Sequence, residues 1–214
     1  MLYESDEQLS EALQTWTSKN KFKLAAYLLL LFAIVFGIQT WNINKQNQNI
    51  AASNMFNKTI DLLKNNKDAT VNLDKTIHKY NNSVYAGLSQ IISSKIVFNS
   101  NIENSIAQLQ NIIKKNIQPA ISDIARLKLA RIYLYQNQPN KAQATLNTIN
   151  KINKKHPITL ILLGDINFAN NSYKQALWHY TQAQNTITKI NPEWQAINQY
   201  INAKINLAQS KIKS

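Results

Sequence analysis

Histidine and the carboxylic acids are the side chains of this sequence that could act as metal ligands or acid–base catalysts. The histidines stand at positions 78, 156 and 179, and no two have the His-x-x-x-His spacing that puts both imidazoles on one helix face. The chain has no cysteine, which excludes disulfides, thiolate metal sites and cysteine nucleophiles. A histidine metal site would need ligands brought together from distant parts of the chain.

Carboxylates are few and scattered in the larger, C-terminal part of the chain. Residues 42–214 hold 7 acidic residues against 21 lysines and arginines, a net charge of +14, and no two acids form a pair suited to acid–base catalysis. His179 lies beside Trp178 and Tyr180 on a repeat helix, which favours a packed or solvated side chain over a catalytic one. We therefore expect a protein that is not an enzyme and has no cofactor; a hydrolase with an unrecognised site is the alternative.

The composition predicts an all-helical protein. The 214 residues include only 3 glycines and 4 prolines, too few for the tight turns of a β-rich fold. The basic residues are 22 lysines and 2 arginines, and the chain also has 30 asparagines and 28 isoleucines, as codon bias in an AT-rich genome would produce. With so little arginine we expect no nucleic acid partner; lipid headgroups or an acidic protein fit the charge better.

An uncharged apolar segment predicts a transmembrane helix over residues 24–41. Lys23 and Lys45 bracket 21 uncharged residues, whose helical length roughly matches the ~30 Å hydrocarbon core of a bilayer. A buried core helix and a cleaved signal peptide are the alternatives. The apolar run is longer than that of a usual signal peptide, and no small-residue cleavage site follows it directly. We interpret the segment as an uncleaved anchor.

The lysines around the span predict its orientation. Three lysines lie shortly before the span, and Lys45 is the only basic residue in the fifteen that follow it. This asymmetry places residues 1–23 in the cytoplasm and residues 42–214 outside the inner membrane, in the periplasm of a bacterium with two membranes.

Residues 1–23 also contain an amphipathic helical pattern. Leu9, Leu13 and Trp16 recur with the spacing of one helix face. Trp41 stands at the other end of the apolar segment, where interfacial aromatic residues are common. One interpretation is that the stripe merely lies on the membrane. The other is that the stripe, together with Trp41, docks on a cytoplasmic or membrane partner.

A repeat of 34 residues organises the C-terminal part. This period separates Ala130 from Gly164 and Ala142 from Ala176, and small residues at such positions let two helices cross closely. The pattern resembles the tetratricopeptide repeat. We therefore predict a tetratricopeptide-like α-solenoid over residues 42–214, with a looser earlier unit in which Ala107 precedes Ala142 by 35 residues. Helical hairpins that stack by chance are the alternative.

Proline and the last apolar stripe predict helix boundaries in this solenoid. The prolines at 119, 139, 157 and 192 fit first helical positions, where a missing N–H costs nothing. A helix from Glu193 to about Lys211 would cap the C-terminal end, with Trp194, Ile201 and Leu207 on its apolar face.

Repeats of this type commonly bind an extended or helical segment in a concave groove. The usual repeat geometry predicts a groove lined by Leu127, Arg131, Leu134 and Tyr135 from the first unit and by Ile161, Asp165 and Phe168 from the second.

The order of these parts resembles the YfgM family. The matching positions include Tyr3, Glu7-Gln8, Leu13, Trp16, Asn20, Trp41-Asn42, Tyr85-Ala86, Leu129-Ala130-Arg131, Leu146 and Ile149. The resemblance covers essentially the whole chain. It implies an ancillary subunit of the SecYEG translocon that works with the membrane-anchored periplasmic chaperone PpiD and passes exported client chains to chaperones. Composition and spacing by themselves predict a membrane-tethered interaction domain, for which a scaffold or assembly factor of a pilus or outer-membrane complex is the alternative.

Overall fold

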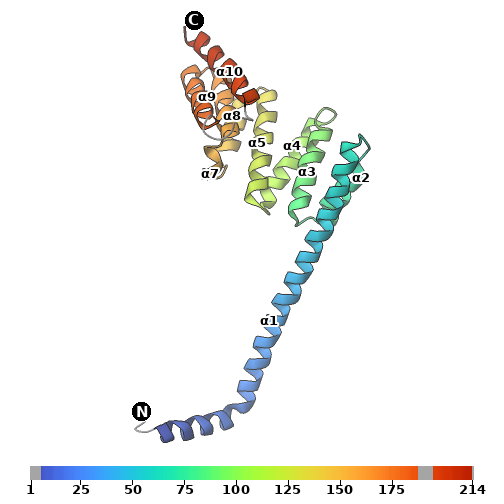
Figure 1. The fold of residues 1–214 in the computed structure, drawn as a ribbon, viewed down its shortest axis with the longest axis vertical. Coiled ribbons are helices and arrows are strands. Elements are labelled where there is room, and N and C mark those ends of the chain that lie inside the picture. Colours follow the sequence, from blue (N-terminus) through green and yellow to red (C-terminus); the bar gives the residue numbers. More distant parts are fainter. Residues whose placement is uncertain (1–5, 188–194, 214) are drawn as a thin grey trace. The chain divides into compact units, whose positions relative to one another are not determined.

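A computed structural model describes residues 6–187 and 195–213 of the chain. The regular structure in these ranges is entirely helical (Figure 1). The helices are α1 (Asp6–Lys64), α2 (Thr70–Lys79), α3 (Val84–Val97), α4 (Ile102–Lys115), α5 (Pro119–Tyr135), α6 (Pro139–Asn147), α7 (Lys151–Lys154), α8 (Pro157–Ala169), α9 (Tyr173–Ile187) and α10 (Gln195–Lys213). The chain divides into two compact units, residues 1–51 and 52–214, and each is described by itself.

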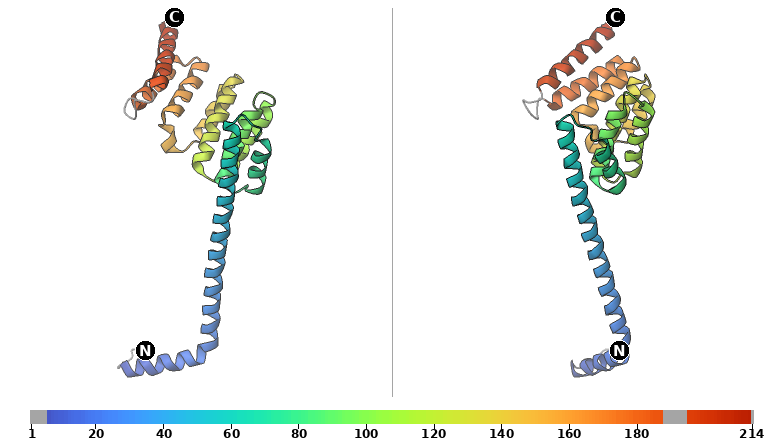
Figure 2. Two further views of the ribbon diagram at one scale, coloured as in Figure 1. Left: turned by 45° about the vertical axis from the view of Figure 1, so that its right-hand side comes forward. Right: turned by 90° about the vertical axis from the view of Figure 1, so that its right-hand side faces the viewer.

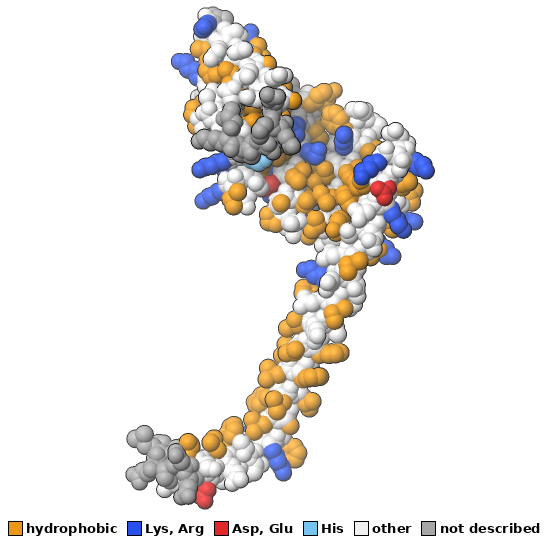
Figure 3. All heavy atoms as spheres, in the orientation of Figure 1, with side chains coloured by type: hydrophobic (Ala, Val, Ile, Leu, Met, Phe, Trp, Pro, Cys, Tyr) orange, Lys and Arg blue, Asp and Glu red, His pale blue; other side chains and the backbone are white. Residues whose placement is uncertain are grey.

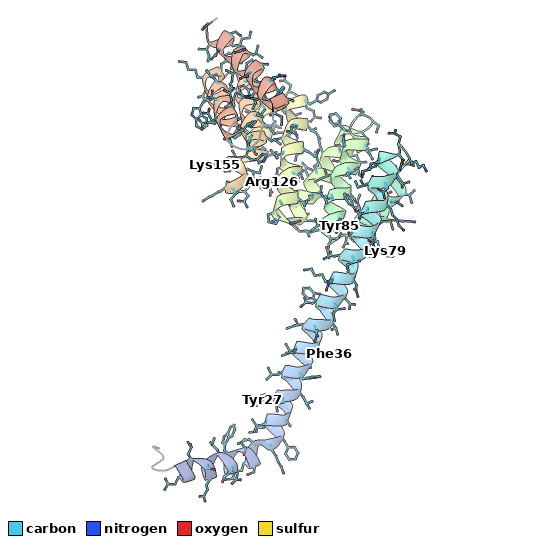
Figure 4. All side chains as sticks on the ribbon, viewed as in Figure 1. Tyr27, Phe36, Lys79, Tyr85, Arg126 and Lys155 are labelled. Atoms are coloured by element: carbon cyan, nitrogen blue, oxygen red, sulfur yellow. The ribbon has the colours of Figure 1, made fainter. Side chains whose placement is uncertain are left out.

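The first unit consists of the N-terminal part of α1, and its apolar side chains are exposed. Leu29 and Phe32 are each 71% exposed, and the most apolar window of the helix has a mean hydropathy of 2.0 with none of its residues buried. Figure 4 shows Tyr27 and Phe36 projecting outward from the helix, and Figure 3 shows apolar side chains along its length. Because a helix satisfies its backbone hydrogen bonds internally, it can present such a surface to lipid. α1 continues without a break through residues 23 and 41, the predicted ends of the span.

The second unit is a row of antiparallel helical hairpins (Figure 2). Each helix packs chiefly on its neighbours in sequence: α2 on α3, α3 on α4, α4 on α5, α5 on α6, α8 on α9 and α9 on α10. α7 is a single turn between α6 and α8. Packing between sequence neighbours is the defining property of a solenoid, so the predicted α-solenoid is confirmed.

The helix starts follow from the side chains at their first positions. α5, α6 and α8 each begin at a proline, as the sequence predicts. α3 and α4 use polar caps instead: the side chains of Ser83 and Asn101 accept hydrogen bonds from the N–H groups of Ala86 (3.1 Å) and Asn104 (2.9 Å). The predicted start signal at Pro192 and Glu193 lies outside the described residues.

Asparagine ends helices where other proteins commonly use glycine. Asn66, Asn137 and Asn171 follow helix ends with φ of 53°, 57° and 59°, in the left-handed region. After α5, the N–H of Gln138 donates to the carbonyl of Tyr133 at 2.8 Å, and the residues 34 positions later make the same bond at 2.8 Å. The repeat therefore includes its turn, since asparagine tolerates this conformation better than most residues.

The small residues of the repeat are buried, as predicted. Ala130, Ala142 and Ala176 have no exposed surface, and Gly164 is buried as well. They belong to or adjoin two core clusters. The first is formed by Ile91, Leu109, Ile112, Ala125, Leu129, Ala130, Ile132, Tyr133, Ala142, Leu146, Ile149, Leu162 and Ile166. The second is formed by Leu160, Ala176, Tyr180, Ala183, Ile187, Ile201 and Ala208.

Gly164 is required by the size of its neighbour in α9. A Cβ at Gly164 would lie 2.6 Å from Cδ1 and 2.9 Å from Cζ of Tyr180, far inside van der Waals contact. At the equivalent positions of the preceding repeat, 34 residues earlier, stand Ala130 and Leu146, both buried. The pair thus exchanges volume: a larger side chain on one helix accompanies a smaller one on the other.

In the earlier unit the prediction that placed Ala107 at the crossing is wrong. Ala107 is exposed, and the fourth residue of α4 is Ser105, which occupies the place that Ala142 and Ala176 hold in α6 and α9. Ser105 is 1% exposed, and its hydroxyl donates to the carbonyl of Ser94 at 2.8 Å. The repeat spacing is 37 residues here, because the connection and the length of α5 differ, so a fixed period misplaced the residue.

The C-terminal helix packs on α9 as predicted. Ile201 and Ala208 in α10 have no exposed surface and belong to the second core cluster. Leu207, expected on the same apolar face, is 46% exposed. The predicted start at Glu193 and the side chain of Trp194 lie outside the described residues.

Candidate protein-binding surface

The predicted lining residues of the first repeat divide into exposed and packed side chains. Arg131 is exposed and Tyr135 is 75% exposed. Leu127 and Leu134 are partly buried and pack against the first core cluster. These four residues lie on α5, and the two exposed ones adjoin hollows in the surface.

The first hollow is a pocket of about 330 Å³ between α3, α4 and α5. Its charged lining is basic: Lys95 comes from α3, and Lys128 and Arg131 come from α5. Burial and the positive charges of Arg131 and Lys95 lower the pKa of Lys128. Three cations therefore converge on one small space, with Phe98, Leu109 and Ile132 forming part of its wall.

A second hollow of about 470 Å³ adjoins the first. It is lined by Tyr135 and by the segment from Phe98 to Glu103, and it shares Phe98 and Asn99 with the first pocket. The rings of Phe98 and Tyr135 meet edge to face, with centroids 5.5 Å apart. A polar hollow and a basic pocket thus adjoin each other, and Phe98 of this aromatic pair lines both.

The equivalent face of the second repeat is occupied by its own packing. Ile161 and Phe168 are partly buried against the second core cluster. Asp165 accepts a hydrogen bond from the hydroxyl of Tyr180 at 2.7 Å and pairs with Lys204 of α10 at 2.9 Å. Burial and the hydrogen bond to Asp165 raise the pKa of Tyr180. The structure therefore does not bring the seven predicted lining residues together into one open groove.

A buried ion pair holds the end of the first repeat. Asp123 in α5 is 3% exposed and binds Arg126 at 2.8 Å. The other carboxylate oxygen of Asp123 accepts from the amide of Asn153 at 2.6 Å, so the carboxylate also fixes the segment around α7 (Arg126 is labelled in Figure 4). The sequence analysis missed this cluster; the i, i+3 spacing of an acid and one of only two arginines was its one signal.

The predicted membrane-docking residues lie exposed on α1. Leu9 is 41%, Leu13 is 54% and Trp16 is 55% exposed. Trp41 is 63% exposed, and the ammonium of Lys45 lies 5.2 Å from the centroid of its ring. An aromatic ring with a neighbouring lysine at the end of an apolar helix is typical of a membrane interface.

The side chains that could do chemistry stay apart. Within residues 6–187 and 195–213, no three His, Cys, Asp or Glu side chains gather in a way that could hold a metal ion. His179 is half-buried beside Trp178, with ring centroids 4.8 Å apart, and burial lowers its pKa. On the described surface, the candidate binding sites are therefore the two hollows at α3–α5 and the exposed apolar residues of α1.

Together these features define the class: a tetratricopeptide-like helical repeat protein whose N-terminal helix is long and apolar enough to span a membrane. Residues 14–209 match the tetratricopeptide repeat-like domain family, so the match includes both the span and the repeats. The chain belongs to this family, and within it to the YfgM family, as its relatives indicate.

Three of these relatives carry the name ancillary SecYEG translocon subunit. The proteins of Buchnera aphidicola from Acyrthosiphon pisum and from Schizaphis graminum are 25% and 26% identical, over 75% and 86% of this chain and 82% and 95% of their own length. The protein of Escherichia coli K12 is 22% identical over 69% of this chain and 72% of its own length. No solved structure gives a significant match.

Proposed function

We propose that this chain is a non-enzymatic, membrane-anchored adaptor that associates with the SecYEG translocon. The observation that carries the proposal is the family match over residues 14–209, with relatives named ancillary SecYEG translocon subunit. The exposed apolar part of α1 supports anchoring, and the hollows at α3–α5 support binding. An anchored repeat raises the local concentration of its partner near the translocon, so modest affinity suffices.

In this proposal the N-terminus is cytoplasmic and residues 42–214 are periplasmic. The repeats then face exported client chains and a PpiD-like periplasmic chaperone, and they link the two. The lysine asymmetry around the span supports this orientation. Alkaline phosphatase fused after Ser214 should be active, and a reporter that works only in the cytoplasm should be inactive there. The reverse result would contradict the periplasmic placement.

Co-purification in mild detergent tests the association. The tagged full chain should recover SecY and a PpiD-like chaperone, identified by mass spectrometry. Pilus or outer-membrane components in their place would support the alternative of a scaffold for another envelope complex. A chain whose residues 1–44 are replaced by a cleavable signal should lose SecY, because we place translocon contact on the first unit.

Substitutions on α1 sharpen this test. Leu9→Ser, Leu13→Ser and Trp16→Ser together should reduce recovery of SecY if the stripe docks on the translocon. The matched control is Gln14→Ala with Ser18→Ala, two exposed positions on the other side of the same helix. Equal recovery from both variants would mean that the stripe only rests on the lipid and that the span makes the contact.

A further inference from the structure

The basic pocket at α3–α5 holds positive charge that no carboxylate of the described residues neutralises. Lys95, Lys128 and Arg131 line it, no carboxylate does, and none of the three forms an ion pair with a described residue. Like charges brought this close repel one another. A bound anion would remove that repulsion.

We propose that this pocket binds an acidic side chain of a partner protein, within an extended segment whose next apolar residue rests on Phe98 and Tyr135. The inference rests on the proposed adaptor function, since it assumes a protein partner. It adds the chemistry of that partner: a carboxylate followed by an apolar side chain.

The shape and wall of the pocket favour a peptide. Its volume of about 330 Å³ accommodates a side chain, and the partly buried ring of Phe98 adds an apolar surface to its charged lining. The adjoining hollow is also lined by Asn99, whose amide suits the backbone of an extended chain. A lipid headgroup would use the charges but not this neighbouring polar hollow.

Glu103 gives the site a direction. It lines the second hollow, whereas the three cations line the first pocket. A second acidic residue of the ligand is disfavoured there, so the acidic end of the segment belongs in the basic pocket. The same carboxylate disfavours a phosphate backbone running through both hollows, which argues against nucleic acid.

Codon bias does not account for Arg131. The chain has 22 lysines and only 2 arginines. One of them, Arg126, is fixed by the buried carboxylate of Asp123, and the other lines this pocket. A guanidinium binds a carboxylate through two parallel hydrogen bonds, which an ammonium cannot do. The second arginine thus stands where that geometry would be used.

The repeat itself does not create such a site. Asp165 is the 34-residue equivalent of Arg131, and it is bound to Tyr180 and Lys204. A ligand acid would meet a carboxylate there in place of a guanidinium. The proposed site is therefore specific to the α3–α5 surface.

The test measures peptide binding by the full chain in detergent. The probe is a fluorescein-labelled peptide of sequence Ser-Asp-Glu-Asp-Leu-Phe-Ser, and its comparison is the isosteric Ser-Asn-Gln-Asn-Leu-Phe-Ser. Fluorescence anisotropy should give at least tenfold tighter binding of the acidic peptide. The difference should shrink from low to physiological salt, as the Debye length falls toward ~8 Å.

Matched variants assign the binding to the pocket. Arg131→Gln and Lys128→Gln should each weaken binding of the acidic peptide by about tenfold, the scale of one charge-assisted contact. Lys174→Gln on α9 removes the same charge from an exposed position elsewhere and should change binding less than about twofold. Near-ultraviolet circular dichroism and thermal unfolding should match the parent chain, so that a loss is not unfolding.

Three results would overturn the inference. The acidic and isosteric peptides could bind equally, or Lys174→Gln could weaken binding as much as Arg131→Gln. Alternatively, Arg131→Gln could leave peptide binding unchanged while it weakens binding of a fluorescent, water-soluble short-chain phosphatidylglycerol, which would make the pocket a lipid site.

The same preparations keep the two proposals apart. If SecY co-purifies but the acidic peptide does not bind, the pocket inference fails and the adaptor function stands. If the acidic peptide binds through Arg131 but SecY does not co-purify, the pocket inference stands and the translocon association fails.

Discussion

The α5–α6 and α8–α9 hairpins have the same backbone plan and use one of its positions differently. Arg131 in α5 and Asp165 in α8 are 34 residues apart. Arg131 is exposed at an open pocket, whereas Asp165 is bound by Tyr180 and Lys204. The difference arises from a third helix, because α10 packs on α9 and brings Lys204 to the second hairpin. The position of a residue in the repeat therefore predicts where its side chain lies on the helix, but it does not predict which side chains of other helices contact it.

The same comparison shows which features the two hairpins share. Both need a small residue early in the second helix, Ala142 in one and Ala176 in the other, and both are fully buried. Where the hairpins differ in side-chain volume, the two residues of a contacting pair change together. The first repeat has Ala130 and Leu146, and the second has the smaller Gly164 and the larger Tyr180. Packing constrains the sum of two volumes, whereas it leaves either volume free to change.

The largest effect is expected where the hairpins are alike. Ala142→Leu and Ala176→Leu should each lower the free energy of unfolding by about 1–3 kcal/mol, because three extra heavy atoms must enter a closed helix crossing. Thermal unfolding of the full chain in detergent, followed by near-ultraviolet circular dichroism, measures the change. Ala107→Leu is the control and should unfold like the parent, since Ala107 is exposed. If all three variants behave alike, the repeat assignment is wrong.

The next effect concerns the exchanged volumes. Gly164→Ala should destabilise the fold by about 1–2 kcal/mol, because its Cβ meets the buried ring of Tyr180. In the Tyr180→Leu background, which copies the pair of the first repeat, the same change should be neutral or stabilising, since alanine favours helix by about 1 kcal/mol over glycine. A double-mutant cycle of unfolding free energies measures the coupling. Additive effects would show that the two positions are independent.

A smaller effect is expected where the hairpins differ. Lys204→Gln removes the partner of Asp165 and should cost about 1 kcal/mol, as for a hydrogen-bonded ion pair that is only partly buried. Arg131→Gln, at the position equivalent to Asp165, should change stability by less than about 0.5 kcal/mol, because Arg131 forms no ion pair with a described residue. Denaturant unfolding of both variants compares them directly. The comparison fails if Arg131→Gln is the more destabilising of the two.

The smallest effect is a dependence on pH confined to the second hairpin. Burial lowers the pKa of His179 below its ordinary value of 6.5, so the folded state disfavours the proton that the unfolded chain accepts. The free energy of unfolding should therefore fall as pH drops through 6.5 toward the lower folded pKa, and it should be fully recovered above 6.5. His179→Gln should flatten this part of the profile when unfolding is measured between about pH 5 and 7.5. If the slope of unfolding free energy against pH is unchanged in His179→Gln, the pH dependence belongs to other titratable groups.

The sequence by itself determined the local structure and the family. The apolar segment from 24 to 41 is recognisable as a candidate membrane span without any partner, because its length and hydropathy are properties of the sequence. Prolines 119, 139 and 157 start helices because a missing N–H costs nothing at the first helical position. Ala142 and Ala176 are buried as predicted, since close helix crossing demands small side chains.

Only the tertiary structure decided which equivalent residues stay open. Arg131 and Asp165 have the same place in the repeat, and the predicted groove treated them alike. Their surroundings depend on α3 and α4 in one case and on α10 in the other, which are contributed by distant sequence with its own spacing. Likewise, Ser105 rather than Ala107 enters the first crossing because the spacing to Ala142 is 37 residues there and not the predicted 35. The environment of a side chain is set by contacts between helices, and a periodic pattern along one helix does not predict those contacts.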